Sequence, residues 1–108
     1  LPLIAIAADH GGYPLKQAII EAYKDRLAFL DLGTNAAESC NYADYGHALA
    51  EALEKGRAEK GIIICGTGLG ISIAANRHRH IRAALCTDVT MARLARQHND
   101  ANVLALGA

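Results

Sequence analysis

The stretch from Gly61 to Ser72 constrains the fold of this chain more than any other part of the sequence. It begins with residues 62–65, an unbroken apolar run that has glycines on both sides. Such a run is typical of a short strand that is buried on both faces inside a parallel sheet. Residues 71–76 are predicted to form a helix, and alternate glycines precede it, namely Gly66, Gly68 and Gly70. We therefore predict a strand, a glycine-rich turn and a helix in direct succession.

Strands and helices are predicted to alternate along the rest of the chain. Apolar runs indicate further strands at residues 3–8, 27–32, 82–86 and 103–106. Helical spacing indicates helices at 14–23, at 43–55 and after residue 87. Pro14 suits the first turn of the first helix, Gly56 ends the second, and Thr87 is the expected N-cap of the last. This alternation predicts right-handed βαβ units. The expected fold is α/β, a Rossmann-like three-layer αβα sandwich with a five-stranded parallel sheet in one domain.

Each of the three longer helices has apolar residues at helical spacing, which predicts one shared face. The first helix is expected to bury Leu15, Ala18, Ile19, Ala22 and Tyr23. The second is expected to turn Ala48, Leu49, Ala52 and Leu53 inward, and Met91, Leu94, Ala95 and His98 share one face of the last.

The composition argues against several classes of function. The chain has 108 residues, of which 52% are hydrophobic, so one globular domain is expected. Eleven basic residues balance eleven acidic ones and are dispersed, which gives no support for nucleic-acid binding. No apolar run approaches membrane-spanning length, and no signal peptide is visible. The three cysteines have no metal-type spacing, so we expect a reduced, cytoplasmic setting without a bound metal or cofactor.

Ligands of parallel α/β sheets bind beyond the carboxyl ends of the strands. Reactive side chains follow three of the predicted strands: Asp9-His10 follow the first, Cys65 with its glycines ends the third, and Thr87-Asp88 follow the fourth. His98 and Asn99 lie elsewhere, at the far end of the last helix. If this pair serves the same site, we expect it to do so from another subunit.

The residues at this edge suit the removal of a proton beside a carbonyl group. A helix N-terminus favours the thiolate form of a nearby cysteine, so Cys65 can act as a base. Backbone N–H groups of the glycine turn can stabilise a developing oxyanion. His98, near a helix C-terminus, suits proton donation, and Asp9 beside His10 can orient or relay a proton. Together these groups predict an enediolate intermediate that needs no metal.

Simpler interpretations of the same residues remain open at this stage. A free cysteine at a strand end is most often a small buried hydrophobic residue, and glycines there permit close helix–sheet packing. The glycine run is also close to a dinucleotide-binding fingerprint, and Asp88 follows about one βα unit later, as a ribose-binding acid would. That fingerprint would need a glycine at Ile71 and belongs on a first strand, which argues against dinucleotide binding. Each histidine would individually pass as a surface or turn residue; these are His10, His47, His78, His80 and His98.

Three segments closely resemble type B ribose-5-phosphate isomerases and their wider family, which includes galactose-6-phosphate isomerase subunits and allose-6-phosphate isomerase. These segments are Asp9-His10-Gly11-Gly12 with Leu15-Lys16, residues 65–76 (CGTGLGISIAAN) and residues 96–104 (RQHNDANVL). The resemblance runs along the whole chain in order. It implies a metal-free aldose–ketose isomerase that acts on a sugar phosphate, with ribose 5-phosphate as the expected substrate.

The resemblance also implies roles for single residues. Cys65 would move a proton between the first two sugar carbons, and Thr67 would help proton transfer between the oxygens. His98 would open the furanose ring with the assistance of Asp9. Contacts with the enediolate, the sugar or the phosphate are implied for Asp9, His10, Tyr42, Gly66, Thr67, Gly68, Leu69, Gly70, Ser72 and Asn99.

The family is dimeric or tetrameric, and its site is completed across the dimer interface, so a homodimer or tetramer is expected. Members without the cysteine carry a glutamate where this chain has Ile71, so the cysteine variant applies. Asn41 replaces the aspartate that commonly precedes Tyr42. The family continues for a few dozen residues past Ala108, with phosphate-binding arginines and a C-terminal helix. Residues 1–108 are therefore expected to lack that helix and to expose an apolar patch.

Two other functions compete with an isomerase of this type. One is a non-catalytic sugar-phosphate-binding domain, and the other is a structural subunit that depends on another chain, as in galactose-6-phosphate isomerases. Cys65, Thr67 and His98 occur together in one chain, which favours a complete enzyme. The sequence leaves five-carbon and six-carbon sugar phosphates both open.

Overall fold

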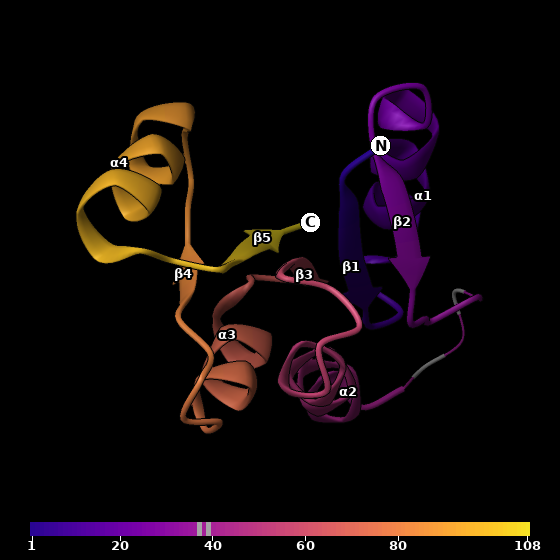
Figure 1. The fold of residues 1–108 in the computed structure, drawn as a ribbon. Helices are drawn as coiled ribbons and strands as arrows, with labels where there is room; N and C mark the ends of the chain where they lie inside the picture. The colour runs from indigo at the N-terminus through magenta and orange to yellow at the C-terminus, as the bar shows by residue number, and fades with distance from the viewer. Residues whose placement is uncertain (37, 39) are drawn as a thin grey trace.

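Strands and helices alternate from one end of the chain to the other in a computed structural model that describes residues 1–36, 38 and 40–108 (Figure 1). In chain order the elements are β1 (Leu3–Ala8), α1 (Tyr13–Tyr23), β2 (Ala28–Asp31), α2 (Tyr42–Glu54), β3 (Lys60–Cys65), α3 (Leu69–Asn76), β4 (Ala83–Leu85), α4 (Val89–Asn99) and β5 (Val103–Gly107). Every predicted element is present, with bounds that differ by up to two residues at an end.

All strand pairs are parallel, and the five strands lie in the order β2-β1-β3-β5-β4. Right-handed crossovers place a helix on one face when the chain moves one way across the sheet, and on the other face when it moves back. The connections through α1 and α4 run in one direction, and those through α2 and α3 run in the other. Figure 1 shows the result, with α1 and α4 above the sheet and α2 and α3 below it. The predicted α/β three-layer sandwich is confirmed.

The main core lies between the sheet and the α2–α3 layer. Alternate residues of the central strands point into it because side chains alternate across a strand. Its fully buried members include Ala5, Ala7, Leu49, Ile63, Ile71, Ala75 and Ala105. Many of these are alanines, so the helices can pack close to the strands. The other face carries a smaller buried cluster of Ile6, Ala8 and Ile64.

The buried face of α1 differs from the prediction. Leu15, Ile19 and Ile20 pack against the sheet, whereas Ala18, Ala22 and Tyr23 are exposed. Lys16 is the fully buried residue of this helix, with none of its side chain exposed. Its ammonium group lies 2.8 Å from both carboxylate oxygens of Asp31 at the end of β2. Helical spacing predicted Leu15 and Ile19 correctly, but it missed Lys16 because an ion pair, and not an apolar contact, holds this residue.

Helix α4 also differs from expectation. None of its residues is buried, and Met91 and Leu94 are more than a third exposed, at 43% and 40%. Ala92 and Ala95 are the half-buried residues on its sheet side. The predicted N-cap, Thr87, is wrong, because the side chain of Asp88 accepts the Met91 N–H at 2.8 Å. Asp88 is the better cap since an ionised carboxylate also favours the positive end of the helix.

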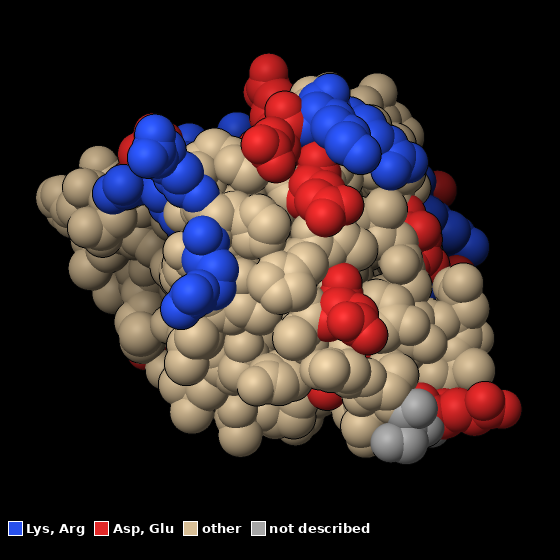
Figure 2. Space-filling model, turned by 90° about the horizontal axis from the view of Figure 1, so that it is seen from below, with Lys and Arg blue, Asp and Glu red and all other residues tan. Residues whose placement is uncertain are grey.

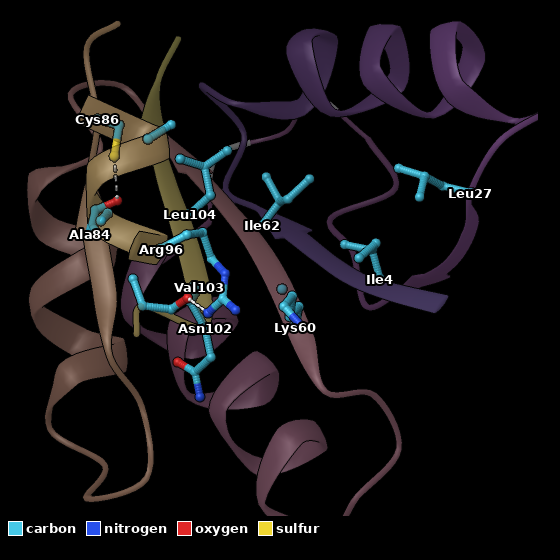
Figure 3. Close-up of a pocket in the computed structure, with 14 residues that line it drawn as sticks. Ile4, Leu27, Lys60, Ile62, Ala84, Cys86, Arg96, Asn102, Val103 and Leu104 are labelled. Atoms are coloured by element: carbon cyan, nitrogen blue, oxygen red, sulfur yellow. Dashed lines mark hydrogen bonds between the residues drawn. The ribbon is translucent and has the colours of Figure 1, made fainter. Parts of the chain in front are cut away.

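An open apolar trough separates α1 from α4 on the upper face of the sheet. Its floor and sides are lined by Leu27, Ile62, Leu104, Leu106 and Ala92, and we call this surface the α1–α4 trough. Figure 3 shows one part of it, a hollow of about 210 Å³, with Ile62 and Leu104 on the sheet and Leu27 facing them. The expected exposed apolar patch is therefore present.

The outer surface of the α2–α3 layer is different. Figure 2, which looks onto this layer from below, shows mostly uncharged atoms with scattered acidic and basic side chains. Neither sign of charge gathers there, which agrees with a composition that does not favour nucleic acid. Among the described residues, no helix is both long and apolar enough to cross a membrane.

Candidate functional site

The strand order puts a topological switch point at the carboxyl ends of β1 and β3, and we call this place the crevice. These neighbouring strands lead to helices on opposite faces of the sheet, which is where parallel sheets bind ligands. Ala8 lies beside Ile64, and the Asp9 N–H donates to the Ile64 carbonyl at 3.1 Å. The two segments with the strongest sequence signals, 9–12 and 65–70, are thus brought together at this point.

Asp9 is held rigidly at the end of β1. It is only 8% exposed, and its Oδ1 accepts the Gly12 N–H at 3.0 Å. Gly11 lies between Asp9 and the glycine turn, because a Cβ at Gly11 would stand 3.4 Å from Asp9 Oδ1 and 3.6 Å from the Gly66 nitrogen. The Asp9 carboxylate therefore borders the turn that follows β3.

His10 follows Asp9 and has a defined ring orientation. The backbone N–H of Cys40 donates to His10 Nδ1 at 3.2 Å, so this nitrogen carries no proton in that contact. In the neutral ring the proton is then on Nε2, which is able to donate to a ligand. Sequence reasoning missed this partner, because nothing in the loop before α2 indicates which backbone group meets the ring.

Cys65 ends β3 beneath the glycine turn. Its side chain is 5% exposed, and its sulfur accepts the Gly68 N–H at 3.2 Å. This hydrogen bond holds the sulfur beneath the turn that leads into α3. The geometry therefore places the Cys65 thiol next to the backbone N–H groups of the turn.

The turn over Cys65 requires glycine at Gly68. This residue is the N-cap of α3 with φ of +79°, and a Cβ there would lie 2.5 Å from Leu85 Cδ1. The Thr67 hydroxyl accepts the Leu69 N–H at 3.1 Å, which fixes the start of the helix. We call the backbone N–H groups of residues 66–70 the cradle.

Space for a ligand lies above the cradle. Gly66 and Thr67 are exposed, and a Cβ at Gly66 would meet no atom within 4 Å. The ring of Tyr42, at the start of α2, packs against Gly70 and forms one side of this space. Ser72 faces away, since its buried hydroxyl donates to the Leu69 carbonyl at 2.8 Å.

His98 and Asn99 lie at the amino ends of the strands, on the side of the sheet opposite to the crevice. Helix α4 starts beyond the carboxyl end of β4 and runs back for 11 residues, about 16 Å. At its end, the Asn99 carbonyl accepts Arg82 Nε at 2.7 Å, and Arg82 precedes β4. The chain therefore groups Asp9, His10, Tyr42, Cys65 and Thr67 and leaves His98 and Asn99 apart from them.

Sequence reasoning also missed a chain of hydrogen bonds that connects α1 to the end of β1 through the residues after β2. Asp31 Oδ1, besides pairing with Lys16, accepts the Gly33 N–H at 2.9 Å. The Gly33 carbonyl in turn accepts the Ala8 N–H at 2.7 Å, next to Asp9. Leu15-Lys16 stood in the first motif, but a lysine in an apolar helix did not indicate a buried ion pair.

Cys86 is a thiol that the crevice does not use. Burial, and secondly the Asp88 carboxylate, raise the pKa of Cys86 above its ordinary value. Because only the thiolate reacts, alkylation of Cys86 at pH 8 is expected to be slower than that of free cysteine. Asp88→Asn keeps a capping oxygen and removes the charge, so it should speed the reaction several-fold, as mass spectrometry would measure. An unchanged or slower rate would contradict this electrostatic effect.

Comparisons with known proteins agree with these motifs. A sequence model of the family described as Ribose/Galactose Isomerase matches residues 4–108. The chain is 49% identical over 106 residues to a "Putative sugar phosphate isomerase" of Rickettsia bellii, covering 97% of this chain and 74% of that protein. It is 45% identical to "Ribose-5-phosphate isomerase B" of Escherichia coli, covering 97% and 71%.

Solved structures give the same result. The structure of Clostridium thermocellum ribose-5-phosphate isomerase B matches with a TM-score of 0.95 and 55% identity, covering 97% of this chain and 72% of that one. The Thermotoga maritima ribose 5-phosphate isomerase matches with a TM-score of 0.94 and 47% identity, covering 97% and 73%.

Proposed function

Because the chain belongs to the ribose/galactose isomerase family and is a sugar-phosphate isomerase, we propose that it interconverts ribose 5-phosphate and ribulose 5-phosphate through an enediolate. The observation that carries the proposal is the buried Cys65 sulfur, which accepts the Gly68 N–H at 3.2 Å beneath an open cradle. A thiol that can act as a base and backbone N–H groups that can stabilise an oxyanion are what an aldose–ketose proton transfer needs.

In this mechanism Cys65 takes the proton from the second carbon of the open-chain aldose. The electron pair forms a carbon–carbon double bond, and the carbonyl oxygen gains negative charge beside the cradle. Thr67 assists the transfer of a proton between the two substrate oxygens. Cys65 then returns its proton to the first carbon, which gives the ketose with no net change in atoms or electrons.

The remaining residues of the crevice bind the substrate. Asp9 and His10 contact the sugar from the end of β1, with His10 Nε2 as a donor, and Asp9 assists ring opening. Tyr42 forms one wall, and the N–H groups of Gly66 and Gly70 meet the enediolate. Those of Gly68 and Leu69 donate to Cys65 Sγ and Thr67 Oγ1 and hold the turn in place. The Ser72 hydroxyl donates to the Leu69 carbonyl at 2.8 Å, so within this set Ser72 holds the start of α3.

The proposal includes a homodimer or tetramer that brings His98 and Asn99 of a second subunit to the crevice. It is supported by their position, since within one chain they lie at the other edge of the sheet. We place the enzyme in the cytoplasm and in the pentose phosphate pathway. The free state of Cys40, Cys65 and Cys86 supports a reduced compartment.

A second candidate substrate is galactose 6-phosphate. The chain is 42% identical over 106 residues to "Galactose-6-phosphate isomerase subunit LacB" of Clostridium acetobutylicum, covering 97% of this chain and 61% of that protein. The decisive experiment is an isomerase assay with ribose, allose and galactose phosphates. We expect the highest kcat/KM on ribose 5-phosphate, and a higher value on a six-carbon substrate would overturn that choice.

The proposal also includes a C-terminal helix of the family's type that follows residue 108 and covers the α1–α4 trough. The apolar lining of the trough supports it, since Ile62, Leu104 and Leu106 are only half-buried and no described element covers them. Phosphate-binding arginines belong to the same segment in the family resemblance. For enzymatic tests we therefore define an extended chain, which carries such a segment after Ala108.

Ribose 5-phosphate is expected to bind residues 1–108 at least ten- to a hundredfold more weakly than it binds the extended chain. Charge-assisted contacts are worth roughly 1.5–3 kcal/mol each, and about 1.4 kcal/mol is a factor of ten in affinity. Calorimetric titration of both chains measures the difference. Equal micromolar binding would show that the phosphate site lies within residues 1–108.

Replacement of His98 by alanine in the extended chain should impair cyclic substrate more than open-chain substrate. The reason is the ring-opening role, which an acyclic sugar phosphate does not need. Steady-state kinetics with ribose 5-phosphate and with a sugar phosphate too short to cyclise separate the two steps. Equal losses on both substrates would count against the role.

A further inference from the structure

Three histidines gather away from the crevice, between α2 and the segment that joins α3 to β4. His47 Nδ1 lies 2.8 Å from His78 Nε2, and the two ring centroids are 5.1 Å apart. The ring of His80 stands edge-on to that of His78, with centroids 6.2 Å apart. His80 Nε2 donates to the Ala50 carbonyl at 2.8 Å, which holds this ring against α2.

The cluster is separate from the proposed site. Helix α2 begins at Tyr42 beside the cradle and runs toward the opposite edge of the sheet, so His47 lies more than one turn further along it. His78 follows the end of α3, which starts at the cradle and runs in the same direction. Nothing in the proposed isomerase reaction uses these histidines.

The His47–His78 contact places two imidazole nitrogens almost where a metal ion would need them. Zinc bonds imidazole nitrogen at about 2.0–2.1 Å, so two such ligands at octahedral or tetrahedral angles lie about 2.8–3.4 Å apart. The observed 2.8 Å separation is at the lower end of that range. To share an ion, both rings must turn so that their nitrogen lone pairs meet at one point, and the donor ring must move its proton to its other nitrogen.

The surroundings permit a cation despite two nearby arginines. Arg77 and Arg79 flank His78 in sequence and are exposed. Asp44 and Glu51 lie three residues before and four residues after His47 on α2, and both are also exposed. Residues at this spacing share one side of a helix, so the two carboxylates offset the arginine charges around the pair.

We propose that His47 and His78 form a two-histidine site for a divalent transition-metal ion such as Zn²⁺, Ni²⁺ or Cu²⁺. Imidazole nitrogen suits these metals, whereas Mg²⁺ and Ca²⁺ prefer oxygen ligands. Across residues 1–36, 38 and 40–108, no group of three or more histidine, cysteine or acidic side chains is placed to hold a metal. Water therefore supplies the other ligands, and His80 stays on the Ala50 carbonyl, outside the site.

Such an ion would cross-link α2 to the segment after α3. An ion that binds only the folded chain stabilises it by an amount that grows with the logarithm of ion concentration. The melting temperature of the metal-free chain should therefore rise with added Zn²⁺ or Ni²⁺ and stay constant with added Mg²⁺.

The test is a Zn²⁺ titration of the metal-free, reduced 108-residue chain with ¹⁵N-labelled histidines, observed by NMR. We expect one equivalent to shift His47 Nδ1 and His78 Nε2 and to leave His10 and His98 unchanged. His47→Gln and His78→Gln should each weaken binding at least tenfold in a parallel Ni²⁺ calorimetric titration. His80→Gln, which keeps a donor for the Ala50 carbonyl, is the matched control and should bind as the parent does.

The imidazole spectrum separates this site from the three cysteines, which also bind zinc. Metal binding that leaves the His47 and His78 ring nitrogens unshifted would overturn the proposal. Equal affinity in the parent, His47→Gln and His78→Gln chains would overturn it as well, as would a response to Mg²⁺ equal to that to Zn²⁺.

Discussion

Replacing Cys65 by alanine is expected to lower kcat for ribose 5-phosphate by about 10²- to 10⁴-fold in the extended chain, the range that a positioned general base contributes. Cys65 is 5% exposed, and the substitution removes only its sulfur atom. The cradle above it should therefore keep its shape. Substrate binding should stay nearly unchanged, because loss of the base affects mainly the transition state. Steady-state kinetics and calorimetric titration measure the two effects separately.

Cys86→Ala is the matched control for this substitution. Cys86 is also a buried thiol, but it lies after β4, where its Sγ donates to the Ala84 carbonyl at 3.6 Å. We expect the control to keep parental turnover. Equal activity losses in the two variants would point to a general effect of losing a buried thiol.

Replacing Asp31 by asparagine should lower the free energy of unfolding by about 3 kcal/mol, the lower end of the range for breaking a buried ion pair. Lys16 has no exposed side-chain surface, so its ammonium group would lose its charged partner and remain buried. The lower end applies because the Asp31 side chain is 34% exposed and part of the pair's field is already screened by water. Urea unfolding of the parent and the variant measures the difference.

Lys16→Met gives the matched comparison, and it should cost less than Asp31→Asn. It removes the fully buried charge and leaves a carboxylate that water can reach and that still accepts the Gly33 N–H. The double variant should be more stable than Asp31→Asn alone, since no buried charge remains unpaired. The opposite order of the two single variants would contradict this account of the pair.

The fold could be predicted from the sequence because its strongest signals are local. An apolar run bounded by glycines, such as residues 61–66, specifies a buried strand and its ends without reference to the rest of the chain. Pro14 and Gly56 mark the ends of helices through their own backbone preferences, and Gly56 has the expected positive φ of +74°. The alternation of elements then leaves few topologies open.

The errors arose where the outcome depends on distant partners. Lys16 is buried because Asp31, on another element, meets its charge, and no spacing rule signals such a pair. Met91 and Leu94 are exposed because none of the residues that the structure describes covers that side of α4. The His47–His78 contact joins residues 31 positions apart. When each was considered alone in the sequence, both passed as ordinary surface or turn histidines.

The candidate site was predicted in part for the same reasons. The rule on strand ends brought Asp9 and Cys65 to one edge, and the structure places them on adjacent strands. The position of His98 in the sequence predicted that it lies at the far end of the last helix, which the structure confirms. Its proposed action from a second subunit remains a prediction, as do the roles of the individual residues.

Solvent proton exchange at the second carbon of the sugar tests the role of Cys65 most directly. The extended chain is incubated with ribose 5-phosphate in D₂O, and deuterium at that carbon is followed by NMR, with Cys65→Ala beside the parent. If Cys65 is the base, the parent incorporates deuterium and the variant shows none above the rate without enzyme. Incorporation by Cys65→Ala at close to the parental rate would contradict the assignment of this thiol as the base of the reaction.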